Sequence, residues 1–82
     1  MQKYNNILEG MDKIIRKMLP EGIEYDVTSD LTDDLGLDSL KKATFVIELE
    51  ELFDMEFSIS DLEPENFTTI EKVAEIIMNN IE

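Results

Sequence analysis

The stretch of the chain best suited to chemistry runs Asp34-Leu35-Gly36-Leu37-Asp38-Ser39-Leu40. It places one hydroxyl, that of Ser39, directly after an aspartate and three residues after a glycine. If Ser39 begins a helix, Asp38 can cap the amides of the first turn, and Gly36 allows a tight turn before it. The amides and partial positive charge at a helix N-terminus would stabilise a phosphate ester on Ser39. The motif therefore indicates a serine hydroxyl suited to carrying such an ester.

Chemistry that depends on histidine or cysteine is excluded, because the 82-residue chain contains neither. A Ser-His-Asp or Cys-His catalytic group cannot form, nor can a zinc site of the usual Cys/His kind. Carboxylates are abundant, but so short a chain cannot build the deep, buried site that tunes a general acid. We therefore expect no catalysis by this chain alone and no bound metal.

A calcium site is the alternative that the acidic residues raise most directly. Asp30, Thr32 and Asp34 have the alternating spacing of ligands in an EF-hand loop. That loop needs a glycine and a glutamate at positions where this chain has Leu35 and Lys41, so an EF-hand is excluded. One incidental property stays open, which is loose binding of divalent cations by crowded carboxylates: Asp33, Asp34 and Asp38.

The net charge of −13 is carried wholly by the middle of the chain. Residues 21–65 hold 15 acidic side chains and two lysines, Lys41 and Lys42, whereas the rest of the chain is balanced. Strong negative charge opposes binding to nucleic acid or an anionic membrane and favours basic protein partners. No apolar run approaches the roughly 18 residues that span a membrane, and the first residues lack the pattern of a signal peptide. We expect a cytoplasmic monomer that does not insert into membranes.

The first third of the chain predicts an amphipathic helix followed by a long loop. Apolar residues recur every three or four positions up to Met18, and Pro20 then ends the helix. Residues 20–37 form an unusually long connection, and connections of this kind are often functional. We interpret it as an ordered loop with a short turn near residues 31–35. Six apolar side chains can pin it to the core: Ile23, Tyr25, Val27, Leu31, Leu35 and Leu37.

A second helix is predicted over residues 39–53, and it is apolar around most of its circumference. Such a helix is either central or presents an apolar ridge to a partner. The candidates for that ridge lie at the edge of the apolar sector, near Ser39: Leu40, Ala43 and Ile47.

The remaining residues predict one short helix and one longer helix. Residues 60–63 match a capping box within a short element at 54–67, and Pro64 prevents a long helix there. Residues 68–71 form a second capping box, after which apolar residues continue at helical spacing to Ile81. The fold class is therefore all-α: a single domain over residues 1–82, built as a small antiparallel bundle of three longer helices and one short helix, with a long ordered loop after the first.

Beyond the local pattern, the sequence resembles a known family. Asp38-Ser39-Leu40, with Leu35-Gly36 before it, is similar to the phosphopantetheine attachment motif of acyl carrier proteins. Residues 45–54 resemble the second helix of that family, and residues 67–70 resemble the start of its last helix. The likeness extends over nearly the whole chain in order, length and acidity.

The resemblance implies a covalent 4′-phosphopantetheine cofactor on Ser39, attached by a phosphopantetheinyl transferase. Asp38, Leu40 and Gly36 would complete the attachment site. The cofactor's thiol would carry an acyl group as a thioester, which accounts for the absence of cysteine from the chain. The candidate walls for a sheltered acyl chain, for each of which ordinary core is the preferred explanation, are Phe45, Leu49, Leu52, Ile59, Leu62 and Ile77.

Partners in this family are acyl-loading and acyl-processing enzymes with basic docking surfaces that read the second helix. The matching partner-binding positions are Asp38, Leu40, Lys41, Ala43, Thr44, Ile47, Glu50 and Glu51. Two of them depart from the family pattern, because Lys41 and Thr44 stand where an acid is frequent. A reversed charge at an interface changes partner choice. We therefore expect a specialised lipid or polyketide-type pathway in preference to primary fatty-acid synthesis.

Two other functions fit the residues. One is an aminoacyl or peptidyl carrier protein of nonribosomal assembly, which the strong negative charge disfavours. The other is an unmodified acidic helical module that binds a basic partner or cations. Modification of Ser39 distinguishes the two kinds of carrier protein from the unmodified module.

Overall fold

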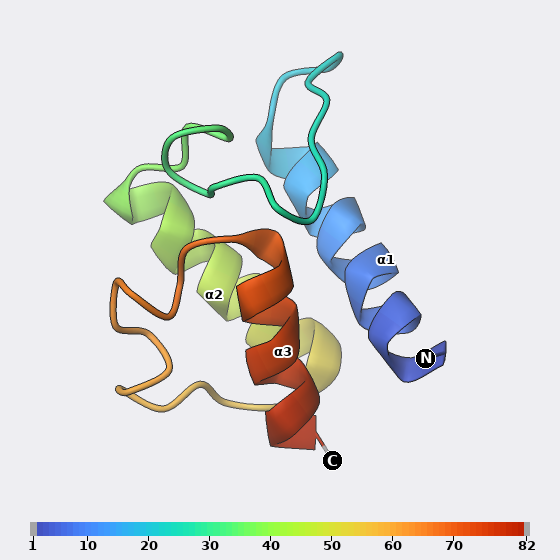
Figure 1. Cartoon of the computed structure of the whole chain (residues 1–82), viewed down its shortest axis with the longest axis vertical. Coiled ribbons are helices and arrows are strands. Elements are labelled where there is room, and N and C mark those ends of the chain that lie inside the picture. Colours follow the sequence, from blue (N-terminus) through green and yellow to red (C-terminus); the bar gives the residue numbers. More distant parts are fainter. Residues whose placement is uncertain (1, 82) are drawn as a thin grey trace.

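The computed structural model describes residues 2–81, which form three helices and no β-strand. They are α1 (Gln2–Met18), α2 (Ser39–Phe53) and α3 (Ile70–Ile81). In Figure 1, α1 runs in the opposite direction to α2 and α3 and lies against both of them. The predicted all-α bundle is confirmed.

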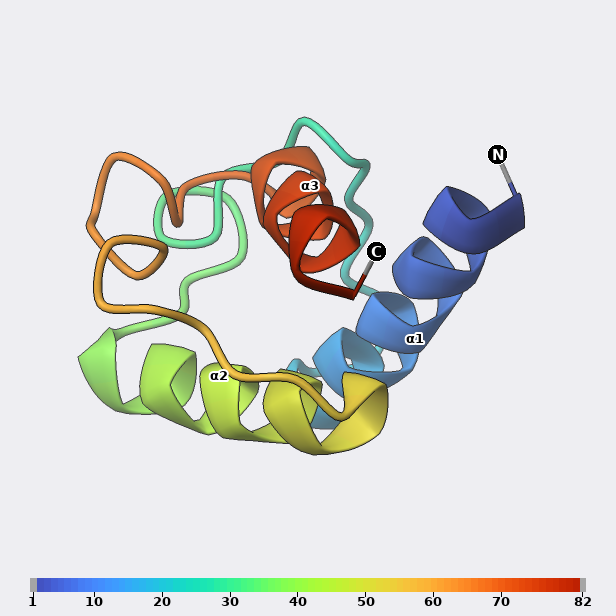
Figure 2. The ribbon, with the colours of Figure 1, turned by 90° about the horizontal axis from the view of Figure 1, so that it is seen from below.

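All three helices contribute side chains to one hydrophobic core. Figure 2 shows the arrangement of the three helices from below. The core includes side chains from both long connections as well as from the helices. The aromatic ring of Phe67 packs edge-on against Phe45 and Phe57, with ring centroids 6.2 and 5.9 Å apart. The buried side chains are Ile7, Met11, Ile14, Ile15, Leu31, Leu35, Leu37, Phe45, Leu49, Phe57, Phe67, Ile70, Val73, Ala74 and Ile77.

The connection between α1 and α2 is an ordered loop, as the sequence predicts. Leu31, Leu35 and Leu37 are buried in the core, and turns occupy residues 31–35. The backbone N–H of Leu31 donates to the carbonyl of Thr68 at 2.8 Å. The N–H of Glu71 donates to the carbonyl of Val27 at 2.9 Å. The loop is therefore fixed to the start of α3 as well as to the core.

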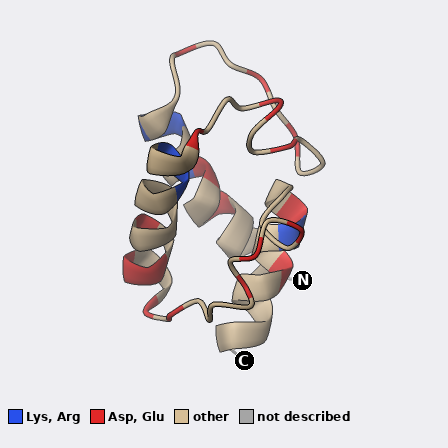
Figure 3. Cartoon of the chain, turned by 90° about the vertical axis from the view of Figure 1, so that its left-hand side faces the viewer, with Lys and Arg blue, Asp and Glu red and all other residues tan. Residues whose placement is uncertain are grey.

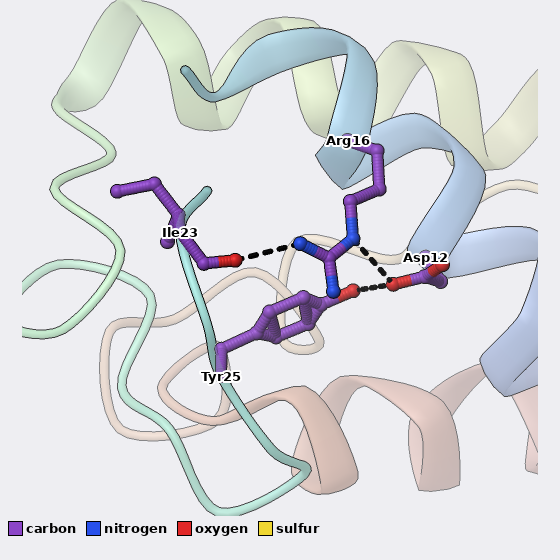
Figure 4. Close-up of polar contacts among 4 residues, drawn as sticks. All are labelled: Asp12, Arg16, Ile23 and Tyr25. Carbon is purple, nitrogen blue, oxygen red and sulfur yellow. Dashed lines mark hydrogen bonds and ion pairs between the residues drawn. The ribbon is translucent and has the colours of Figure 1, made fainter. Parts of the chain in front are cut away.

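A polar cluster ties the first part of this loop to α1 (Figure 4). Arg16 donates from Nη1 to the carbonyl of Ile23 at 2.6 Å and from Nε to Asp12 at 3.2 Å. The guanidinium also lies 4.7 Å from the centre of the Tyr25 ring, and the Tyr25 hydroxyl donates to Asp12. Burial, followed by the hydrogen bond to Asp12, raises the pKa of Tyr25 above its ordinary value.

The short helix predicted within residues 54–67 does not form, and this prediction is wrong. Turns cover residues 59–62 and 64–66 instead. The reciprocal capping contact is made two residues earlier than predicted, because Ser58 and Asp61 each accept the other's backbone N–H through the side chain, at 3.0 Å. Pro64 lacks an N–H and so cannot continue a helical ladder from these turns. The last helix begins with Thr69 as its cap, whose hydroxyl accepts from the Lys72 N–H at 3.2 Å.

Within residues 2–81, no helix combines the length and the hydrophobicity needed to cross a membrane.

Candidate functional site

Ser39 is the first residue of α2, and its side chain is exposed. Asp38 caps the helix as predicted, with its backbone extended at φ −80° and ψ −176°. Its carboxylate accepts the N–H of Lys41 at 2.9 Å. Among residues 2–81, no hydrogen bond engages the Ser39 hydroxyl, so the geometry leaves it open to solvent and to a reacting partner.

The turn before Ser39 is held rigidly by hydrogen bonds. Gly36 adopts a φ of +72°, a left-handed conformation that favours glycine. The Asp30 carboxylate accepts the N–H groups of Thr32 and Asp33, both at 2.8 Å. The Leu37 N–H donates to the Leu31 carbonyl at 2.9 Å. These contacts, together with the buried leucines of the loop, fix the direction in which the chain enters α2.

The two hydrogen bonds that Asp30 accepts lower the pKa of its carboxyl below the ordinary value of 3.8, the bond from Asp33 having the larger effect. Lys42 contributes a smaller electrostatic effect in the same direction. The charged form of Asp30 is therefore part of the structure that positions Ser39.

A groove of about 340 Å³ opens beside Ser39, between α2 and the segment that precedes α3. Its lining is mostly apolar, with one charged residue from α2. The residues at this groove fit a phosphate ester that has a long attached arm. The exposed hydroxyl offers the attachment point, and the apolar walls offer a path for the arm. The residues that line it are Ser39, Lys42, Ala43, Val46, Leu62, Pro64 and Phe67.

Most of the groove residues are absent from the set that the sequence predicts. Among the residues that it lacks, Lys42 and Val46 follow Ser39 by three and seven residues, which is the spacing of one helix face. That spacing was a usable signal for them. Pro64 and Phe67 come from a distant segment, and only the fold places them beside the serine.

The predicted acyl-chain walls are only partly brought together. Phe45, Leu49 and Ile77 are fully buried, and Leu62 lines the groove. Leu52 is half exposed beside α1, and Ile59 is 90% exposed in a turn. Of the six predicted walls only Leu62 lines the groove, and the role of the other five as acyl-chain walls stays a prediction.

The outward side of α2 carries the apolar ridge that the sequence proposes. Leu40 is 77% exposed, Ile47 is 56% exposed, and Ala43 is exposed between them. Thr44 and Glu51 are exposed on the same side of the helix. The predicted partner-binding positions thus include a continuous exposed strip along α2.

Two other predicted positions, Glu50 and Lys41, are arranged differently. The Glu50 carboxylate accepts the N–H of Phe57 at 2.9 Å, so it also holds the chain after α2. Lys41 is exposed and lies on the same side of α2 as Glu48, which follows it by seven residues. Glu48, which the sequence did not single out, pairs with Lys17 of α1 at 2.8 Å.

Acidic residues are spread over the connections and along α2 (Figure 3). Beyond the end of the ridge, a shallow groove of about 580 Å³ is lined by Ile47, Glu50, Glu51, Asp54, Met55 and Glu56. Within the described part of the chain, no group of three or more acidic residues is arranged to hold a metal ion.

Comparison with known proteins agrees with this geometry. A family model described as "Phosphopantetheine attachment site" matches residues 11–77. The chain is 42% identical over 77 residues to an acyl carrier protein of Buchnera aphidicola subsp. Acyrthosiphon pisum (strain 5A), covering 90% of this chain and 91% of that protein. No solved structure matches the chain significantly. The family match spans most of the chain and implies a covalent 4′-phosphopantetheine. The chain belongs to the acyl carrier protein family.

Proposed function

We propose that Ser39 carries the 4′-phosphopantetheine and that the whole chain acts as one carrier domain for acyl groups. When bound, the cofactor supplies a terminal thiol that holds the acyl group as a thioester. The observation that carries this proposal is the exposed Ser39 hydroxyl at the first turn of α2, beside a groove with largely apolar walls.

The residues around Ser39 hold the hydroxyl in place for the transferase. Asp38 caps α2, and the turn at Gly36 is anchored by buried Leu35 and Leu37. The chain supplies no histidine or cysteine that could act on the cargo. In our proposal it therefore presents and shelters the acyl group, while partner enzymes perform every chemical step.

Loading with coenzyme A and a broad-specificity phosphopantetheinyl transferase tests the site. We expect the intact mass of the wild-type protein to rise by one phosphopantetheinyl group. The Ser39→Ala variant should show no rise. Ser60→Ala is the matched control, because Ser60 is exposed in a turn and should load like the wild type. Loading of Ser39→Ala would refute the assignment, as would failure of the wild type with several transferases.

We propose that partner enzymes dock on the exposed strip of α2 through apolar contact and basic side chains. Leu40 and Ile47 offer apolar area next to Ser39, and the acidic residues at the far end of the helix offer charge complementarity. Lys41 interrupts the negative surface directly beside the attachment point. On this basis we propose a specialised lipid or polyketide-type pathway in preference to primary fatty-acid synthesis.

The proposed specialised pathway can be tested by placing acidic residues at positions 41 and 44 of α2. We expect Lys41→Glu with Thr44→Glu to increase the rate at which an acyltransferase of primary fatty-acid synthesis uses the loaded protein. Thr28→Glu is the control, because it adds negative charge in the exposed loop and away from α2. An unchanged rate, or a wild type that already matches a primary carrier protein, would contradict the specialised role.

A further inference from the structure

Lys42 is distinguished from every other basic side chain by its surroundings. Of the seven Lys and Arg residues, six are exposed, whereas Lys42 is half-buried. It lies one helical turn after Ser39 and lines the same groove. Its neighbour Lys41 is exposed and does not line that groove. The chain thus places one sheltered positive charge next to its modifiable serine, although its net charge is −13.

Among the residues that the structure describes, no carboxylate forms an ion pair with Lys42. The ion pairs among residues 2–81 are Asp12–Arg16 and Lys17–Glu48, and neither includes Lys42. Asp30 is close enough for Lys42 to help lower its pKa. However, the Asp30 carboxylate already accepts two backbone N–H groups, which hold it in the turn. Lys42 therefore has hydrogen-bonding capacity left for an anion in the groove.

We propose that Lys42 is a positioning residue that pairs with the phosphodiester on Ser39 and directs the attached arm into the apolar groove. This inference rests on the proposed attachment at Ser39. An ammonium group is a compact point charge suited to a phosphate oxygen. Pairing with the phosphodiester would offset the repulsion that the acidic surface exerts on it.

The residues that line the groove determine where the rest of the arm lies. A phosphodiester held at Lys42 leaves the remainder of the arm beside Ala43, Val46 and Leu62. Without that contact, the arm would extend into solvent more of the time. A partly exposed ion pair is weak. Its loss should change the fraction of molecules whose arm lies in the groove by about two- to fivefold.

NMR of the loaded protein tests the proposal without any activity assay. The readouts are the ³¹P chemical shift of the phosphodiester and the nuclear Overhauser effects from the arm to the methyl groups of Val46 and Leu62. We expect Lys42→Gln to move the ³¹P resonance and to weaken those effects about two- to fivefold. Lys42→Arg should retain most of both signals, and Lys41→Gln is the matched control with the same loss of charge.

The outcomes separate this inference from the proposed function. If the wild type gains no phosphopantetheinyl mass, the attachment proposal fails and the role of Lys42 fails with it. If Ser39 is loaded but Lys42→Gln leaves the ³¹P shift and the arm contacts unchanged, only the role of Lys42 is overturned. An equal effect of Lys41→Gln would overturn it too, since net charge alone would then explain the change. Titrating the loaded wild type with salt gives a test that needs no variant, because screening should reproduce the ³¹P change of Lys42→Gln.

Discussion

The two sides of α2 are built from the same kinds of residue but have opposite environments. Phe45 and Leu49 on the inner side are fully buried, whereas Leu40 and Ile47 on the outer side are largely exposed. In α1 and α3, by contrast, the apolar residues gather on one side, where they form core. The difference shows that apolar side chains of α2 build the core on one side and stay exposed on the other, where we propose that partners bind.

The largest expected effect comes from truncating the inner side. Phe45→Ala should destabilise the protein by about 3–5 kcal/mol, because it removes a fully buried ring that packs against Phe67. Urea unfolding followed by circular dichroism measures this loss. Leu40→Ala, the outer-side counterpart, should change the free energy of unfolding by no more than about 0.5 kcal/mol. Similar losses for both variants would contradict the division of α2 into two sides.

Substitutions on the outer side of α2 should weaken partner binding and leave stability nearly unchanged. Ile47→Ala should raise the KM for the phosphopantetheinyl transferase by about fivefold or more while leaving the unfolding curve nearly unchanged. Ile59→Ala is the control, since Ile59 is also highly exposed but lies outside α2 and the groove. Equal KM changes for the two variants would show that the α2 strip has no special role.

Substitutions at the start of α2, next to Ser39, should have a smaller effect on stability. Asp38→Ala removes the helix cap that accepts the Lys41 N–H and should cost about 1 kcal/mol of stability. Asp38→Asn should restore most of it, because asparagine is also a good cap. If Asp38→Ala left the free energy of unfolding in urea unchanged, the cap would not stabilise the start of α2.

The smallest expected effect concerns the acidic loop before α2. Because the folded protein lowers the pKa of Asp30, its charged form stabilises the fold at pH values above the ordinary carboxyl pKa of 3.8. That contribution is lost as the pH falls through the lowered pKa of the folded state. Asp30→Asn should therefore flatten the acid side of a plot of Tm against pH. Asp33→Asn is the control, because its carboxylate accepts none of the hydrogen bonds among residues 2–81. Identical curves for Asp30→Asn and the wild type would contradict the role of the Asp30 carboxylate.

Much of the site was predictable because it is local. The bounds of α2, the Asp38 cap, the turn at Gly36 and the exposed ridge all follow from spacings of a few residues. The turn at residues 31–35 was predictable for the same reason, since Leu31 and Leu35 flank three polar residues whose backbone lies within hydrogen-bonding reach of the loop's own carboxylates.

The features that sequence reasoning missed depend on contacts between distant segments. The groove needs Pro64 and Phe67 beside α2, and the Lys17–Glu48 pair joins residues 31 positions apart. In the segment predicted as a short helix, Ser58 and Asp61 make the capping contact, whereas the sequence pattern predicted it at Ser60 and Glu63. Pattern alone does not rank such alternatives.

The central claim is that one serine, Ser39, carries the cofactor. The most direct measurement is peptide mapping of the loaded wild-type protein by tandem mass spectrometry after trypsin digestion. Cleavage after Lys17 and Lys41 releases Ser39 in a peptide that also contains Thr28, Ser29 and Thr32. We predict that the phosphopantetheinyl group lies on Ser39 alone. Localisation to any other hydroxyl of this peptide, or to a different peptide, would contradict the account.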